Sequence, residues 1–259
     1  MNEQYTTRLN AGLGLIDETK GLLNLWSPGM SSGQLYDQAL ISGLFPGTTA
    51  RRLRNIVAEC FAPRFLVNAA APARHLRILI GAIEKSELDQ LLLLFTCRAN
   101  RILLDFITEV YWERYAAGQK SISNDDAMAF VQRSVDCGRT QKRWEETTVR
   151  RVSAYLTGCC ADYGLLERGQ KRERRIIPLT MTTLAAAYLA YDLHFQGLGD
   201  NAVAGDDEWA LFGLTQSETV SELKRLASKN LLMIQSAGGA IRISWKYQSM
   251  EDLCHVLAK

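Results

Sequence analysis

Hydrophobic residues recur at helical spacing along most of the chain, and one stretch shows the pattern clearly. Residues 47–65 read GTTARRLRNIVAECFAPRF, and the apolar positions follow the i, i+3, i+4, i+7, i+8 order of a single buried helical stripe. The stripe consists of Leu53, Ile56, Val57, Cys60 and Phe61. Thr48 or Thr49 follows Pro46 and Gly47, and either hydroxyl suits the N-cap of this helix.

The segment before this helix, SSGQLYDQALISGLF, predicts a shorter helix and a tight turn that contains glycine. Residues 31–61 therefore have the outline of a helix-turn-helix. At 100° per residue the polar face of the second helix carries Arg51, Arg52 and Asn55, with Arg54 on its flank. This face is either an ordinary solvated surface or a DNA contact. Arginines in a first helical turn oppose the helix dipole, which favours the functional reading.

A second helix pattern leads into a strongly basic loop. Val149, Val152, Leu156, Cys159 or Cys160, and Tyr163 form its apolar stripe, and Gly164 suits the left-handed position that ends a helix. A basic stretch and the β-prone Ile176 and Ile177 follow, which is the order of a winged-helix unit. The candidate phosphate contacts of this wing are Arg168, Lys171, Arg172, Arg174 and Arg175. The alternative is that charge at a hairpin tip keeps exposed strands from pairing.

A second unit of the same type closes the chain between residues 214 and 245. Val220, Leu223, Leu226 and Ala227 define its helix stripe, and two short strands flank a Gly238-Gly239 turn. The exposed side of this helix carries Glu218 and Glu222, which a DNA groove repels. We therefore expect this unit to be structural or to contact protein.

These patterns predict a mainly α protein with two domains. Residues 1–137 are expected to form a helical bundle that contains the helix-turn-helix, because helical stripes with mixed charges continue through residues 76–137. Residues 138–259 are expected to form a winged-helix-like region with short β-hairpins. The boundary is placed where CGRTQKRWEETT changes the composition to basic.

Charge is segregated along the chain although the net charge is only +2. Residues 51–77 carry six basic and one acidic side chain, and residues 139–175 carry ten basic and five acidic side chains. Residues 176–222 carry seven acidic side chains and no lysine or arginine. Two basic stretches on a nearly neutral chain favour an anionic partner such as the DNA backbone.

The residue patterns that mark common enzymes are not found. His75, His194 and His255 lie far apart, no HExxH, GxxxxGK[ST] or GxSxG motif occurs, and the six cysteines lack CxxC spacing. We therefore predict no catalytic, metal or cofactor site and no small-molecule substrate, with the cysteines buried as small hydrophobes. A nuclease or modifying site assembled from dispersed carboxylates stays open. No signal pattern or membrane-length apolar run occurs, so we expect a cytoplasmic protein that does not contact the membrane.

Several segments together resemble the BrxA family of BREX (bacteriophage exclusion) phage-defence systems. They are YTTRLNAGLGLIDETKGLL near the N-terminus, FPGTTARRLRNIVAECFAPRFL, RWEETTVRRV, and DYGLLE followed by basic residues and RIIPL. The resemblance lies in their order and character over most of the chain, since the family has no short diagnostic motif.

The resemblance implies a mainly helical bacterial protein that binds double-stranded DNA and has no catalytic activity, while other BREX proteins do the chemistry. By position, the family's DNA-binding elements fall on the helix with Arg51, Arg52, Arg54 and Asn55, and on the basic wing 168–175. An alternative function is an adaptor that recruits other BREX proteins through its basic and acidic patches. Salt-sensitive binding to plain duplex DNA distinguishes the two.

Overall fold

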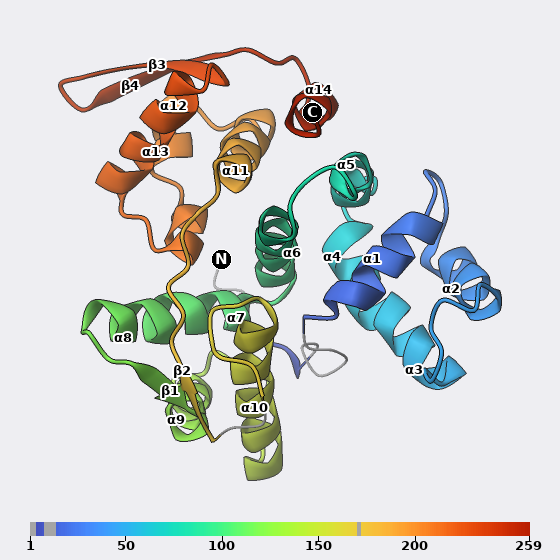
Figure 1. Cartoon of the computed structure of the whole chain (residues 1–259). Helices are drawn as coiled ribbons and strands as arrows, with labels where there is room; N and C mark the ends of the chain where they lie inside the picture. The colour runs from blue at the N-terminus through green and yellow to red at the C-terminus, as the bar shows by residue number, and fades with distance from the viewer. Residues whose placement is uncertain (1–3, 8–13, 170–171) are drawn as a thin grey trace. The chain divides into compact units, whose positions relative to one another are not determined.

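The computed structural model describes residues 4–7, 14–169 and 172–259. Within these ranges the protein is mainly α-helical, with two small antiparallel sheets, β1–β2 and β3–β4 (Figure 1). This confirms the predicted fold class. The chain divides into two compact units, the first formed by residues 1–77 and 92–179 and the second by residues 78–91 and 180–259.

The first unit holds most of the helices. Its elements in chain order are α1 (Ile16–Leu25), α2 (Ser32–Ile41), α3 (Ala50–Asn55), the π-helical segment η2 (Ile56–Phe61), α4 (Ala62–Phe65), α7 (Arg101–Phe106), the π-helical segment η3 (Ile107–Tyr111), α8 (Trp112–Ala116), β1 (Ser121–Ser123), α9 (Asn124–Asp136), α10 (Glu146–Asp162) and β2 (Glu173–Arg175). Two helices, α5 (Ala71–Leu79) and α6 (Lys85–Ala99), each contribute residues to both units.

The predicted helix at residues 50–65 is present as the continuous run α3, η2 and α4. All members of the predicted apolar stripe are buried, with exposed fractions of 1–2%. Thr49 is the N-cap, and its hydroxyl accepts a hydrogen bond of 3.2 Å from the Arg52 backbone N–H. The connection from α2 spans residues 42–49 and is longer than the tight turn that we expected, with Gly43 and Gly47 both at positive φ.

Helices α9 and α10 pack against each other and carry the small sheet of the first unit. The Thr157 hydroxyl in α10 donates a 2.8 Å hydrogen bond to the Asn124 side chain at the start of α9. The expected domain boundary at residues 137/138 falls between these two helices, inside the first unit, because their mutual packing holds them in one body. The change to basic composition at this point therefore reflects more basic side chains on the surface, and the hydrophobic core of the first unit continues across it.

The end of α10 follows the prediction. Gly164 has a φ of 79°, and Leu165 and Leu166 behind it are fully buried. The chain then forms a narrow antiparallel hairpin, in which Leu166 bridges Ile176 and β2 pairs with β1. We call residues 165–169 and 172–176 the first hairpin.

The second unit consists of shorter helices and one regular hairpin. Its elements are α11 (Thr183–Phe195), α12 (Asp200–Ala204), the 3₁₀ segment η4 (Asp207–Phe212), α13 (Gln216–Ser228), β3 (Leu232–Ala237), β4 (Ala240–Trp245) and α14 (Met250–Leu257). Leu223 and Leu226 of the predicted α13 stripe are fully buried. The β3–β4 turn has Gly238 and Gly239 at φ of 56° and 82°, as a primed turn requires, and this confirms the predicted hairpin.

Five of the six cysteines are buried as predicted, and Cys137 is exposed because it follows the last turn of α9. Burial raises the pKa of the Cys159 thiol to about 12, so this side chain stays a neutral thiol. Within the described ranges, no helix combines the length and the apolar composition that crossing a membrane requires.

Candidate nucleic-acid interface

The basic face of α3 is exposed as the helical spacing predicts. Arg51, Arg52, Arg54 and Asn55 all lie on the surface, while Leu53 between them is buried. The Arg54 guanidinium lies 5.1 Å from the centre of the Tyr36 ring in α2, which holds it over that helix. Tyr36 therefore supports one of the four exposed side chains of the α3 face.

The arginines of the first hairpin have different surroundings. Arg168 donates to the Ala161 and Asp162 carbonyls, at 3.5 and 3.0 Å, and so caps the C-terminus of α10. Arg174 is half-buried and donates a 3.0 Å hydrogen bond to the Glu167 carbonyl. Arg168 thus holds the hairpin against α10, whereas the Arg174 bond lies within the hairpin.

The other two described arginines of this hairpin point outward. Arg172 forms a 2.8 Å ion pair with Asp125 in the first turn of α9, and both side chains are largely exposed. Arg175 is exposed, and no ion pair to it occurs among the residues that the structure describes. Lys171, the remaining predicted contact, lies outside the described residues.

The two basic segments meet around one hollow of about 550 Å³. Arg52 comes from α3, and Arg168 and Arg174 come from the first hairpin, so residues more than a hundred positions apart share one wall. Asp17 and Glu18 at the start of α1, and Asp162 at the end of α10, also line the hollow. The site is therefore a mixed cluster in which carboxylates balance the guanidinium groups. The other predicted site residues that the structure describes do not line it.

Helix α10 adds basic residues that our sequence reasoning left out. Its buried stripe faces α9, and Thr147, Arg150 and Arg151 lie on the exposed side. Arg150 forms a 2.5 Å ion pair with Glu146, one turn earlier. The signal for this face was present, because a stripe at Val149, Val152 and Leu156 puts the two arginines opposite the core.

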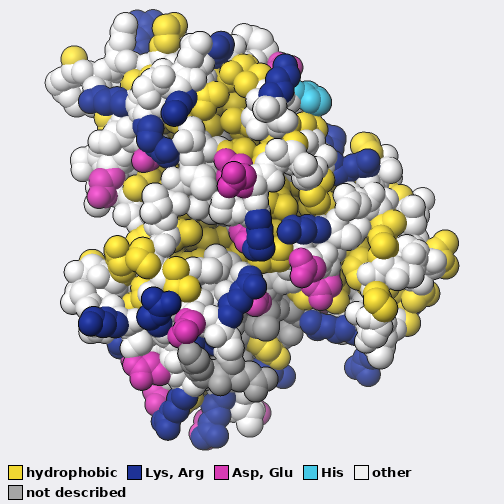
Figure 2. Space-filling view, in the orientation of Figure 1, with side chains coloured by type: hydrophobic (Ala, Val, Ile, Leu, Met, Phe, Trp, Pro, Cys, Tyr) yellow, Lys and Arg dark blue, Asp and Glu magenta, His cyan; other side chains and the backbone are white. Residues whose placement is uncertain are grey.

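The loop that leads into α10 is also basic. Lys142 and Arg143 are exposed, and Arg143 reaches Asp136 at 4.0 Å. Figure 2 shows Lys and Arg side chains gathered over the part of the first unit that holds α9 and α10, with Asp and Glu side chains among them. This surface is enriched in cations but is not a continuous basic face.

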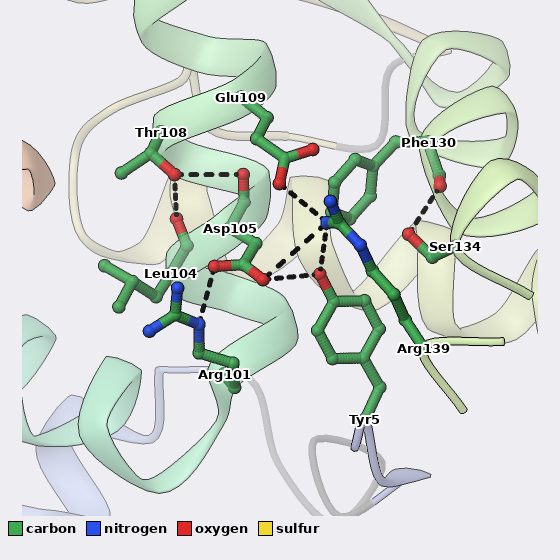
Figure 3. Close-up of polar contacts among 9 residues, drawn as sticks. All are labelled: Tyr5, Arg101, Leu104, Asp105, Thr108, Glu109, Phe130, Ser134 and Arg139. Atoms are coloured by element: carbon green, nitrogen blue, oxygen red, sulfur yellow. Dashed lines mark hydrogen bonds and ion pairs between the residues drawn. The ribbon is translucent and has the colours of Figure 1, made fainter. Parts of the chain in front are cut away.

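A polar cluster anchors the start of this loop (Figure 3). The Tyr5 hydroxyl donates a 2.6 Å hydrogen bond to Asp105, and Arg139 donates to Tyr5 at 3.1 Å and to Glu109 at 2.6 Å. Arg101 closes the cluster with a 2.7 Å ion pair to Asp105. Burial and the Asp105 carboxylate both raise the pKa of Tyr5, so its hydroxyl keeps its proton.

The same cluster includes a backbone contact. The Tyr5 N–H donates a 2.7 Å hydrogen bond to the Arg139 carbonyl, and Tyr5 forms a parallel bridge with Thr140. Residues 139 and 140 directly precede the basic loop and α10. The cluster therefore fixes the position from which α10 begins.

A second anchor holds Gly14 against the end of α10. The Gly14 N–H donates a 2.9 Å hydrogen bond to Asp162, and the Tyr163 hydroxyl donates to the Gly14 carbonyl at 3.1 Å. A Cβ at position 14 would lie 2.7 Å from the Asp162 Cβ, so only glycine fits here without displacement. Nothing in the sequence near Gly14 indicates this packing, because Asp162 lies 148 positions later.

The fold and this site define a class of protein. It is mainly α-helical, and its first unit carries a hairpin after helix α10 and a cluster of basic residues from segments far apart in the sequence. The family model for BrxA matches residues 3–192. The chain therefore belongs to the BrxA family, and it is a component of a BREX phage-defence system. Residues 193–259 lie beyond the matched range.

Comparison with solved structures supports the fold alone. A crystal structure of an uncharacterized protein from Magnetospirillum magneticum is similar, with a TM-score of 0.58 and 11% sequence identity. The similarity covers 74% of this chain and 95% of that chain. None of the curated proteins matches the chain.

Proposed function

We propose that this protein binds double-stranded DNA without catalysing a reaction on it, as the DNA-contacting part of a cytoplasmic BREX assembly. The observation that carries the proposal is the exposure of Arg51, Arg151 and Arg175, which come from α3, α10 and the first hairpin and have no ion pair within the described ranges of the first unit. Two basic segments on one body suit the spaced phosphates of a duplex. Other BREX proteins are the expected protein partners.

The order of elements supports a particular way of docking. In the first unit β1 is followed by α9, α10 and the first hairpin, which is the order of a winged-helix unit. In such a unit the second helix of the pair enters the major groove and the wing follows the backbone. We therefore assign groove contact to Thr147 and Arg151 of α10, and phosphate contact to Arg175 of the hairpin.

The charges of these side chains favour contacts with DNA phosphates over sequence-specific contacts with bases. Arg150 and Arg172 already have carboxylate partners on the protein, so DNA must compete for them. Arg51, Arg151 and Arg175 are exposed, and no ion pair to them occurs within the described ranges. Contacts of this kind give affinity that depends on salt and carries little sequence information.

One observation favours the adaptor as a second candidate function. Leu40, Ile41 and Leu44, at the end of α2 and in the following turn, are 48%, 85% and 54% exposed. A group of exposed aliphatic side chains is a common mark of a protein contact. This surface suits recruitment of another BREX protein, whether or not DNA is bound.

The test is a titration of the purified protein against a fluorescent mixed-sequence duplex at several salt concentrations, read by anisotropy. A triple variant, R51Q/R151Q/R175Q, is compared with K85Q/K229Q/K259Q, which removes the same charge from exposed positions of the second unit. We expect a log–log salt slope of several ions and a loss of about tenfold or more in affinity for the first variant only. Each lost phosphate contact reduces the slope by about 0.9.

Two results contradict the proposal. Absence of binding at low salt excludes direct DNA contact and leaves the adaptor function. Equal loss in both triple variants shows that binding follows total charge and not this surface. Incubation of the duplex with the protein and Mg²⁺ or Mn²⁺ tests the non-catalytic part, and we expect the DNA to stay intact.

A further inference from the structure

The β3–β4 hairpin of the second unit has two edges, one along each strand, and their backbone groups have different hydrogen-bond partners. The strands pair without interruption from Leu232 opposite Trp245 to Ala237 opposite Ala240. Figure 1 shows β4 on the side of the hairpin that faces α12 and β3 on its outer side. The two edges therefore meet different surroundings.

Side chains of α12 accept hydrogen bonds from the backbone N–H groups along the β4 edge. Asp200 accepts a 2.9 Å hydrogen bond from the Ile243 N–H and a 3.2 Å hydrogen bond from the Trp245 indole. Asn201 accepts a 2.8 Å hydrogen bond from the Ile241 N–H. These two side chains take the place of a neighbouring strand, so this edge is not open to pairing.

The same contacts establish which groups of β3 face outward. Because the N–H groups of Ile241 and Ile243 point away from β3, their cross-strand partners form the non-hydrogen-bonded pairs of the ladder. Those partners are Ser236 and Ile234. Their N–H and C=O groups therefore point away from β4, and no partner for them occurs in the described part of the chain.

The β3 edge lacks the devices that usually prevent strand pairing. Its sequence, LMIQSA, contains no charged residue and no proline, and its register contains no bulge. Met233 on its outer face is 66% exposed. The turn and most of β4 are also uncharged, with Arg242 as the exception. An edge of this composition accepts another neutral strand without electrostatic cost.

We propose that β3 pairs in antiparallel orientation with β3 of a second copy of this chain. Ile234 of one copy lies opposite Ser236 of the other, so every outward backbone group of these residues finds a partner in a two-fold arrangement. A second copy is the occupant that these features favour, because an isologous contact needs a surface complementary to itself. A neutral strand with free N–H and C=O groups meets that condition, whereas a charged partner strand gains nothing here.

Sedimentation velocity over a range of protein concentrations tests this pairing. We expect the wild-type mass to rise from the monomer value of 29.0 kDa toward twice that value as concentration increases. Ser236→Pro removes an outward N–H without removing a bond to β4, since proline is tolerated where the N–H faces solvent. This variant should stay monomeric, and Ser236→Thr, which keeps the N–H, should associate like the wild type.

A second variant serves as a control for misfolding of Ser236→Pro. Ser236→Lys keeps the N–H and places a positive charge on the edge, so that two copies repel each other at low salt. We expect its dimer dissociation constant to rise about tenfold or more, with circular dichroism unchanged. A wild-type protein that remains monomeric at the highest concentration overturns the proposal, as does a Ser236→Pro dimer of wild-type affinity. DNA binding plays no part in this test, so its outcome is independent of the proposed function.

Discussion

Two hairpins of the protein each follow a helix that packs on the core, yet they are built in opposite ways. The first hairpin carries charge at most of its exposed positions. Arg168 binds it to a carbonyl at the end of α10, and Arg174 binds the Glu167 carbonyl within the hairpin. The β3–β4 hairpin is nearly uncharged and is held from the side by Asp200 and Asn201. Similar topology therefore does not imply similar use: charge makes one hairpin suited to phosphates, and neutrality makes the other suited to strand pairing.

The largest expected effect comes from removing the support of the β3–β4 hairpin. Asp200→Ala deletes the acceptor of two hydrogen bonds, and bonds to a charged group each contribute about 1.5–3 kcal/mol. We expect the second unit to lose about 3–6 kcal/mol in free energy of unfolding, measured by urea denaturation followed by tryptophan fluorescence. Asn201→Ala, which removes a single neutral acceptor, is the matched control and should cost about 1 kcal/mol. Equal, small losses in both variants contradict the assigned role of Asp200.

The corresponding change beside the first hairpin is Gly14→Ala. The new Cβ meets the Asp162 Cβ at 2.7 Å, and overpacking of this kind costs about 1–3 kcal/mol. We expect a lower midpoint for the first unit in thermal unfolding, with the β3–β4 hairpin unaffected in amide exchange. Gly169→Ala tests the same exchange of residue where nothing lies within 4 Å of the added Cβ, although its positive φ adds backbone strain. A fully wild-type melting curve for Gly14→Ala contradicts this account of the packing.

Removing a positive charge from each hairpin should have different effects on DNA binding. Arg175→Gln in the first hairpin should weaken duplex binding several-fold and reduce the salt slope by about 0.9. Arg242→Gln in the β3–β4 hairpin removes the same charge from an exposed strand and should leave both quantities unchanged. Anisotropy titrations of the two variants in parallel make the comparison. An equal loss for Arg242→Gln shows that both hairpins meet DNA.

The smallest expected effect concerns the ion pair at the tip of the first hairpin. Asp125→Asn removes the carboxylate partner of Arg172 and leaves that guanidinium available to a phosphate. We expect DNA affinity to increase by a factor of about two to three, because exposed ion pairs contribute little. Arg172→Gln should move affinity in the opposite direction. A decrease for Asp125→Asn indicates that the pair positions the hairpin for binding.

Local patterns in the sequence predicted local structure well. The stripe from Leu53 to Phe61, the helix end at Gly164 and the Gly238-Gly239 turn depend on residues close together in the chain, and all three are confirmed. Contacts between distant residues were missed. Nothing near Ser121–Ser123 indicates that this strand pairs with Glu173–Arg175, because that pairing depends on how α9 and α10 pack.

For the candidate site, too, the sequence predicted local features and missed contacts between distant residues. Exposure of the α3 arginines followed from helical spacing and is confirmed, but the contact of Arg168 with the carbonyls at the end of α10 was not predictable from its charge. The position of Arg52 and Arg174 around one hollow depends on the packing of α1, α3 and α10 together. Their role in DNA binding stays a prediction.

The cluster around Tyr5 has a consequence for how the chain is made. Tyr5 binds Arg139, a residue 134 positions later, and that contact positions the start of α10. During synthesis Tyr5 leaves the ribosome before its side-chain partners Asp105 and Arg139, which lie 100 and 134 positions later. Contacts of such long sequence separation close late in folding. The surface that we assign to DNA therefore takes its final form only after Tyr5 and Arg139 have come together.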